Sequence, residues 1–73
     1  MIDPFDIYAW NNKGVALGTL GRHVEAARSF QKAIEIEPTY ATAWKNMGIA
    51  LETLGRKAES EEALGKAKAL GLD

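Results

Sequence analysis

The sequence predicts an all-α protein made of two tandem helix-turn-helix hairpins, four helices that together form a fragment of an α-solenoid. The first observation is an internal repeat: Trp10 recurs as Trp44, 34 residues later, and this period is typical of units made of two helices. The second is that apolar or small residues recur every three or four positions within each copy, as on one helical face. The third is a glycine in the middle of each copy, where a helix would end. The copies align without a gap and are identical at Ala9/Ala43, Trp10/Trp44, Asn12/Asn46, Gly14/Gly48, Ala16/Ala50, Leu17/Leu51, Thr19/Thr53, Leu20/Leu54, Gly21/Gly55, Arg22/Arg56, Glu25/Glu59, Lys32/Lys66 and Ala33/Ala67.

Residues 1–6 are predicted to be the tail of a preceding repeat. Ile2 and Pro4 align with Ile36 and Pro38, which stand at the end of the first full copy. We therefore expect the chain to come from a longer array of repeats.

The first hairpin is predicted to span residues 7–40, with helices over about 7–20 and 23–35. Asp6 is a candidate N-cap, because its carboxylate can accept hydrogen bonds from the free amides of the first turn. Gly21 marks the end of the first helix, and the short link after it favours an antiparallel second helix. Pro38 ends the second helix, because proline lacks an amide donor and disfavours helix in the residue before it.

The second hairpin is predicted to span residues 41–73, with helices over about 40–54 and 57–70. Thr39 is the candidate N-cap of its first helix, and Gly71 the stop of its second. Glycine within a helix costs about 1 kcal/mol relative to alanine, so Gly14 and Gly48 at equivalent positions indicate close packing. We expect Gly14 to face Ala26, and Gly48 to face Ser60.

Composition excludes several classes of protein. The 73 residues contain no cysteine, which removes disulfides, thiolate metal sites and thiol catalysis. Nine basic and ten acidic residues give a net charge of −1, so we expect no nucleic-acid or membrane surface. The N-terminus lacks the basic start and apolar run of a secretory signal, and we expect a cytoplasmic protein. One core of this size rarely stabilises a chain by more than about 3–5 kcal/mol.

The two copies resemble the tetratricopeptide repeat, whose 34-residue pattern is W-x2-L-G-x2-Y, A-x3-F and P. The residues at the positions of this pattern are Trp10, Lys13, Gly14, Leu17, Ala26, Phe30 and Pro38 in the first copy, and Trp44, Met47, Gly48, Leu51, Ser60 and Leu64 in the second. The chain departs from the pattern at Lys13, at Leu17 and Leu51, at Ser60 and Leu64, and at Leu72, where proline would fall.

The resemblance implies a right-handed superhelix in which the first helix of each hairpin lines a concave groove. Such modules bind a peptide or helix of another protein and are not themselves enzymes. The groove residues that the resemblance implies are Tyr8, Asn11, Asn12, Val15, Thr19, Thr42, Lys45, Asn46, Ile49, Glu52 and Thr53. They mix amide, hydroxyl and aliphatic groups, which can hydrogen-bond a backbone and hold side chains.

Other uses of the polar residues are less well supported by the sequence. His23 has no cysteine or second histidine to complete a metal site, so we interpret it as a solvated turn residue. Glu59, Glu61 and Glu62 share a segment with two lysines and form a charged outer face rather than an acid–base pair. We expect no catalytic residue, no metal and no cofactor.

Two alternatives to partner binding remain open. One is self-assembly into homo-oligomers, by stacking of exposed repeat edges or by exchange of hairpins, because about three repeats are usually needed to bury enough core. The other is a regulatory appendage of an enzyme whose catalytic domain lies elsewhere.

Overall fold

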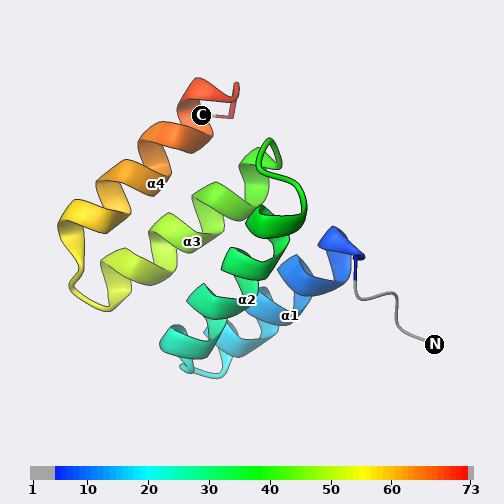
Figure 1. Ribbon diagram of the computed structural model, residues 1–73. Helices are drawn as coiled ribbons and strands as arrows, with labels where there is room; N and C mark the ends of the chain where they lie inside the picture. Colours follow the sequence, from blue (N-terminus) through cyan, green and yellow to red (C-terminus); the bar gives the residue numbers. More distant parts are fainter. Residues whose placement is uncertain (1–4, 73) are drawn as a thin grey trace.

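The computed structural model describes residues 5–72, which form four α-helices in sequence: α1 (Ile7–Thr19), α2 (His23–Ile36), α3 (Ala41–Thr53) and α4 (Lys57–Ala69). The helices follow one another across the molecule, with α1 and α4 at opposite ends (Figure 1). Each helix packs against its neighbours in the sequence, and α1 also touches α3. The predicted all-α fold of two consecutive hairpins is therefore confirmed. The expectation for residues 1–6 falls mostly on residues 1–4, which lie outside the described range.

The two hairpins begin with different capping arrangements. The Asp6 carboxylate accepts hydrogen bonds from the Tyr8 and Ala9 amides at 3.0 and 3.1 Å, so the predicted N-cap of α1 is confirmed. Thr39 as the N-cap of α3 was a wrong prediction: Tyr40 occupies the cap position and makes no side-chain cap bond. The Thr39 hydroxyl instead donates to the Glu37 carboxylate at 2.7 Å, because this charged acceptor lies within reach two residues earlier.

The glycines after α1 and α3 end their helices in the same way. Gly21 and Gly55 have φ values of +81° and +78°, the left-handed region that favours glycine. The Arg22 amide donates to the Leu17 carbonyl at 2.9 Å, and the Arg56 amide donates to the Leu51 carbonyl at 2.9 Å. This is the Schellman arrangement, which satisfies carbonyls left free at a helix end.

The core lies where α2 packs between the helices on either side. One buried cluster contains Ala26, Phe30 and Ala50. A second contains Ala33, Ile34 and Ala43, with both tryptophans packed against it. Most members are alanines, which let helix backbones approach closely. The clusters combine residues of α2 and α3, so the two hairpins share one apolar core.

Gly14 in α1 and Gly48 in α3 face larger residues than the sequence predicted. A Cβ on Gly14 would overlap the ring of Phe30, with 2.7 Å to its Cδ1, and not Ala26. A Cβ on Gly48 would lie 2.7 Å from Leu64 Cγ. Ser60 contacts Gly48 through the backbone instead, since its hydroxyl donates to the Gly48 carbonyl at 2.8 Å. The expectation that Gly14 faces Ala26 was wrong, because Phe30, one helical turn further along α2, fills this space. Gly48 and Ser60 do meet, but Leu64, one turn further along α4, fills the space where a Cβ on Gly48 would lie.

Candidate functional site

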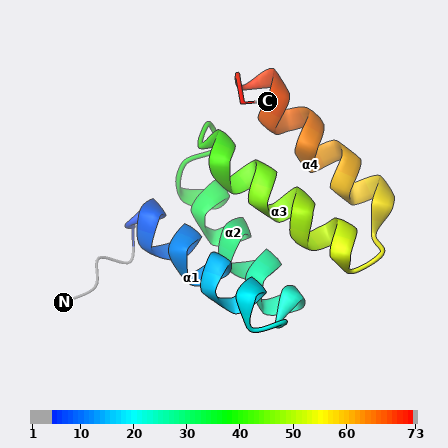
Figure 2. The same ribbon diagram turned by 180° about the vertical axis from the view of Figure 1, so that it is seen from behind.

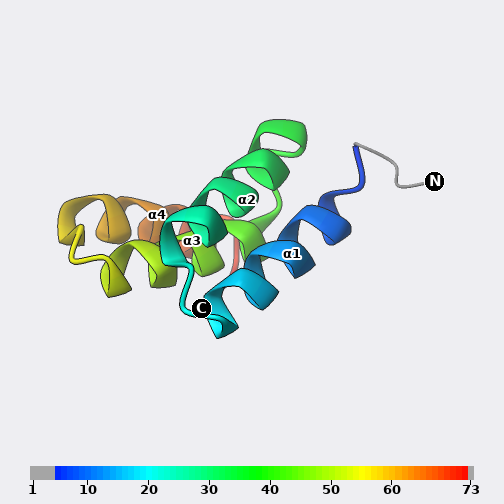
Figure 3. The same cartoon turned by 90° about the horizontal axis from the view of Figure 1, so that it is seen from below.

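The first helices of the two hairpins lie beside each other on one side of the molecule. Figure 2 shows this side, and in Figure 3 α2 lies above α1 and α3. Asn46 on α3 donates from Nδ2 to Oδ1 of Asn11 on α1 at 3.1 Å. This bond joins residues 35 positions apart in the chain and fixes the spacing of the two helices.

A hollow of about 300 Å³ lies between α1 and α3. Five residues of the groove that the resemblance implies line it, namely Val15 and Thr19 from α1 and Asn46, Ile49 and Thr53 from α3. Val15 and Ile49 are 49% and 52% exposed. The hollow is therefore bordered by accessible aliphatic side chains on both helices.

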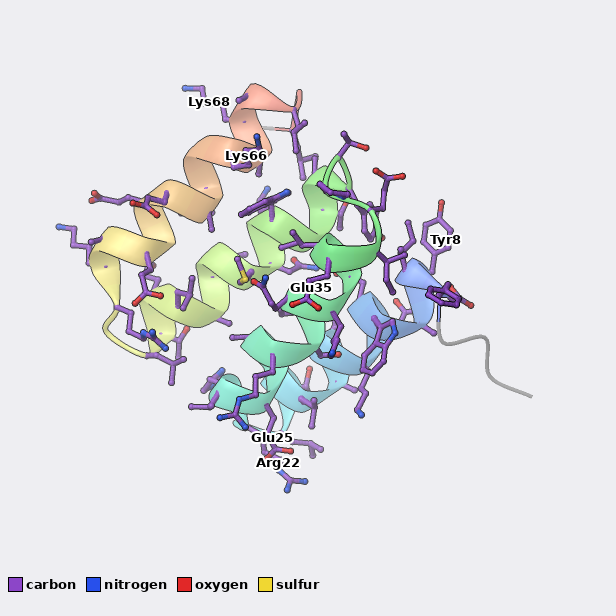
Figure 4. The ribbon with its side chains drawn as sticks, viewed as in Figure 1. Tyr8, Arg22, Glu25, Glu35, Lys66 and Lys68 are labelled. Atoms are coloured by element: carbon purple, nitrogen blue, oxygen red, sulfur yellow. The ribbon has the colours of Figure 1, made fainter. Side chains whose placement is uncertain are left out.

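Six other residues of the expected groove do not line this hollow. Asn11 is only 6% exposed and is held by Asn46. Tyr8 is 64% exposed near the start of α1 (Figure 4), with its ring centroid 5.6 Å from that of Tyr40 in an edge-to-face arrangement. The remaining four, exposed except for the half-buried Lys45, are Asn12, Thr42, Lys45 and Glu52.

Four residues that line the hollow were not among those expected. Phe30 and Ala50 belong to the buried core beneath it, and Gly18 comes from α1. His23 is the first residue of α2 and is half-buried, so its interpretation as a solvated turn residue was wrong. A signal was available for His23: a short turn after Gly21 returns the chain to the last turn of α1, beside Thr19.

The hydroxyl groups in the hollow already have hydrogen-bond acceptors. Thr19 donates to the Val15 carbonyl and Thr53 to the Ile49 carbonyl, both at 3.0 Å. A hydroxyl oxygen keeps acceptor capacity after its proton is donated. The walls can thus accept hydrogen bonds from an extended backbone while Val15 and Ile49 contact an apolar side chain.

None of the described residues that line the hollow is an aspartate, glutamate, lysine or arginine. The exposed ion pairs Arg22–Glu25 and Arg56–Glu59 each measure 2.8 Å, and the first is labelled in Figure 4. Pairs of this kind contribute little to stability.

Burial raises the pKa of Tyr40, and the neighbouring Tyr8 adds to this effect. His23 is the sole titratable side chain among the described residues that line the hollow.

Among residues 5–72 no group of three histidine, aspartate or glutamate side chains is placed to hold a metal ion. None of the described helices is long and apolar enough to span a membrane.

Comparison with known proteins gives a family and a fold. Two sequence models, both described as the tetratricopeptide repeat, match residues 7–40 and 29–64. Together they cover residues 7–64 and identify no catalytic domain. No curated protein sequence matches the chain significantly.

Among solved structures, the chain is similar to the one titled "Crystal structure of MamA", with 26% sequence identity and a TM-score of 0.86. The match covers 90% of this chain and 39% of that chain, so this chain spans well under half the length of that protein. The matching repeats, their spacing and the arrangement of the four helices show that the chain belongs to the tetratricopeptide repeat family.

Proposed function

We propose that the chain binds a segment of another protein in the hollow between α1 and α3. The observation that carries the proposal is the pairing of Val15 and Ile49, about half exposed on opposite helices, around a hollow of about 300 Å³. Repeats of this family are in general protein-interaction modules.

The composition of the hollow indicates what it would take. Its aliphatic border favours an uncharged apolar side chain, because a charged group would lose hydration without gaining a counter-charge. Asn46 can use its amide to bond the partner's backbone, and the threonine oxygens can accept from backbone amides. We therefore expect an apolar anchor residue on an extended segment.

The test begins with random peptides displayed on phage, from which those that bind the chain at low concentration are selected. The affinity of a selected peptide is then measured for the original chain and for its Val15→Ser and Ile49→Ser variants. We expect each substitution to weaken binding about tenfold, which corresponds to about 1.4 kcal/mol.

Val24→Ser is the matched control, because Val24 is 50% exposed but lies on α2 beside a different hollow. Its substitution is expected to leave binding unchanged. Selected peptides that shift amide resonances only on α2 and α4, and that tolerate both substitutions in the hollow, would overturn the proposal.

A further inference from the structure

The packing of α2 against α3 is an internal template for how one hairpin stacks on the next. A hollow of about 250 Å³ lies at this junction, and Ala27 on α2 and Met47 on α3 both line it. Further along, Tyr40 packs against the cluster that contains Ile34. The residues that each helix contributes at these two places are therefore apolar, although Arg28, Gln31, Arg56 and Glu59 also line the hollow.

The two ends of the molecule, α1 and α4, carry the surfaces that correspond in the repeat to the α3 and α2 faces of this junction. An offset of 34 residues, the repeat length, aligns α1 with α3. Helix α1 keeps the apolar residues Trp10 and Leu17, and Leu20 follows at its C-cap. A hollow of about 280 Å³ lies between α1 and α2, and its lining comprises Trp10, Lys13 and Leu17 of α1 together with Glu25, Arg28, Ser29 and Lys32 of α2. At the other end, α4 packs only against α3 among the described helices.

Four apolar residues of the internal junction are replaced by charged residues at these ends. In the repeat alignment, Met47 corresponds to Lys13 on α1, and Ala27 corresponds to Glu61 on α4. These replacements are opposite in sign, so they would attract each other if the ends met.

A second set of apolar residues at the junction is also replaced by opposite charges at the two ends, but here the acidic residue is near α1 and the basic one is on α4. In the same alignment, Tyr40 corresponds to Asp6, which precedes α1, and Ile34 corresponds to Lys68 on α4. Lys68 points away from α3 in Figure 4, toward the outer side of the molecule. Two pairs of opposite polarity would also disfavour a shifted or reversed contact.

We propose that a second copy of this chain stacks head to tail on the first, with its α1 against the outer side of α4. Lys13 of one copy faces Glu61 of the other, and Asp6 faces Lys68. The contact continues the internal α2–α3 junction and lengthens the row formed by α1 and α3. It does not depend on what the hollow between α1 and α3 binds.

The test is sedimentation equilibrium of the full chain over a range of concentrations. We expect the mean mass to rise with concentration, and the association to weaken as salt is added, since screening shortens the reach of the charges. Lys13→Glu and Glu61→Lys each place like charges together, which should raise the dissociation constant at least about tenfold.

The double variant Lys13→Glu with Glu61→Lys restores opposite charges and the net charge of −1, so its association should return to that of the original chain. Glu35→Lys is the control for net charge, because this exposed residue of α2 lies at neither end (Figure 4). Circular dichroism confirms that each variant remains folded. A monomer at all concentrations, or association that the double variant does not rescue, would overturn the proposal and leave the polar side of α4 as a terminal cap.

Discussion

Asn46 donates a hydrogen bond to the buried Asn11 at 3.1 Å and thereby connects the two hairpins across the α1–α3 side. The two asparagines do not occupy equivalent positions in the repeat, since Asn46 aligns with Asn12 and Asn11 with Lys45. The bond is thus a feature of this junction. It also removes Asn11 from the accessible surface that was expected to bind a partner.

Removing the donor of this bond should destabilise the chain. Asn46→Ala leaves the buried Asn11 oxygen without its partner, which we expect to cost about 1–3 kcal/mol. The measurement is the free energy of unfolding from urea denaturation. Asn12→Ala, at the exposed equivalent position, should change it by less than about 0.5 kcal/mol; equal effects of the two substitutions would show that the bond contributes nothing.

Alanine at the tightly packed glycines should be destabilising, although alanine is the better helix former. Gly48→Ala places a Cβ 2.7 Å from Leu64 Cγ and 3.3 Å from its backbone nitrogen, and overpacking of this kind costs about 1–3 kcal/mol. Gly14→Ala should behave similarly against Phe30.

Gly65 provides the contrasting case within α4, because a Cβ there meets nothing within 4 Å. Gly65→Ala should stabilise the chain by up to about 1 kcal/mol, the difference in helix propensity. Thermal unfolding of the three variants separates the two effects. A gain in stability for Gly48→Ala would contradict the packing described for α3 and α4.

Ser60 stands where the family pattern has alanine, and the structure gives a reason. It is 1% exposed, and its hydroxyl donates to the Gly48 carbonyl at 2.8 Å. Ser60→Ala should therefore lower the free energy of unfolding by about 0.5–1.5 kcal/mol. If the variant is as stable as the original chain or more so, the serine is not held for this bond.

Glu37, in the link between α2 and α3, should make a contribution to stability that depends on pH. Hydrogen bonds from the Thr39 hydroxyl, and then from its amide, hold the pKa of Glu37 below its usual 4.5. A carboxyl group with a lowered folded-state pKa stabilises the fold above its unfolded pKa, and that contribution is lost as pH falls through the folded value.

Thr39→Val removes the hydroxyl bond and should raise the pKa of Glu37 toward 4.5. Titration of the carboxyl carbon resonance by NMR measures this change. Thr42→Val, at an exposed position on α3, is the control and should leave the pKa unchanged. An unaltered pKa in Thr39→Val would refute the assignment of the shift to this hydroxyl.

The sequence by itself determined the number of helices and where they turn. Glycine at 21 and 55 is needed because the backbone adopts positive φ there, a local requirement that the residue type reveals. The carboxylate of Asp6 caps α1 through amides two and three residues away, so it too could be identified from the chain alone.

Only the tertiary structure decided which side chains meet between helices. Gly14 packs against Phe30, His23 borders the hollow, and Asn11 is buried under Asn46. These contacts depend on the angle and spacing at which α1, α2 and α3 pack. Periodicity assigns a residue to a helical face, but the distance between faces is set by the combined volumes of side chains far apart in the sequence.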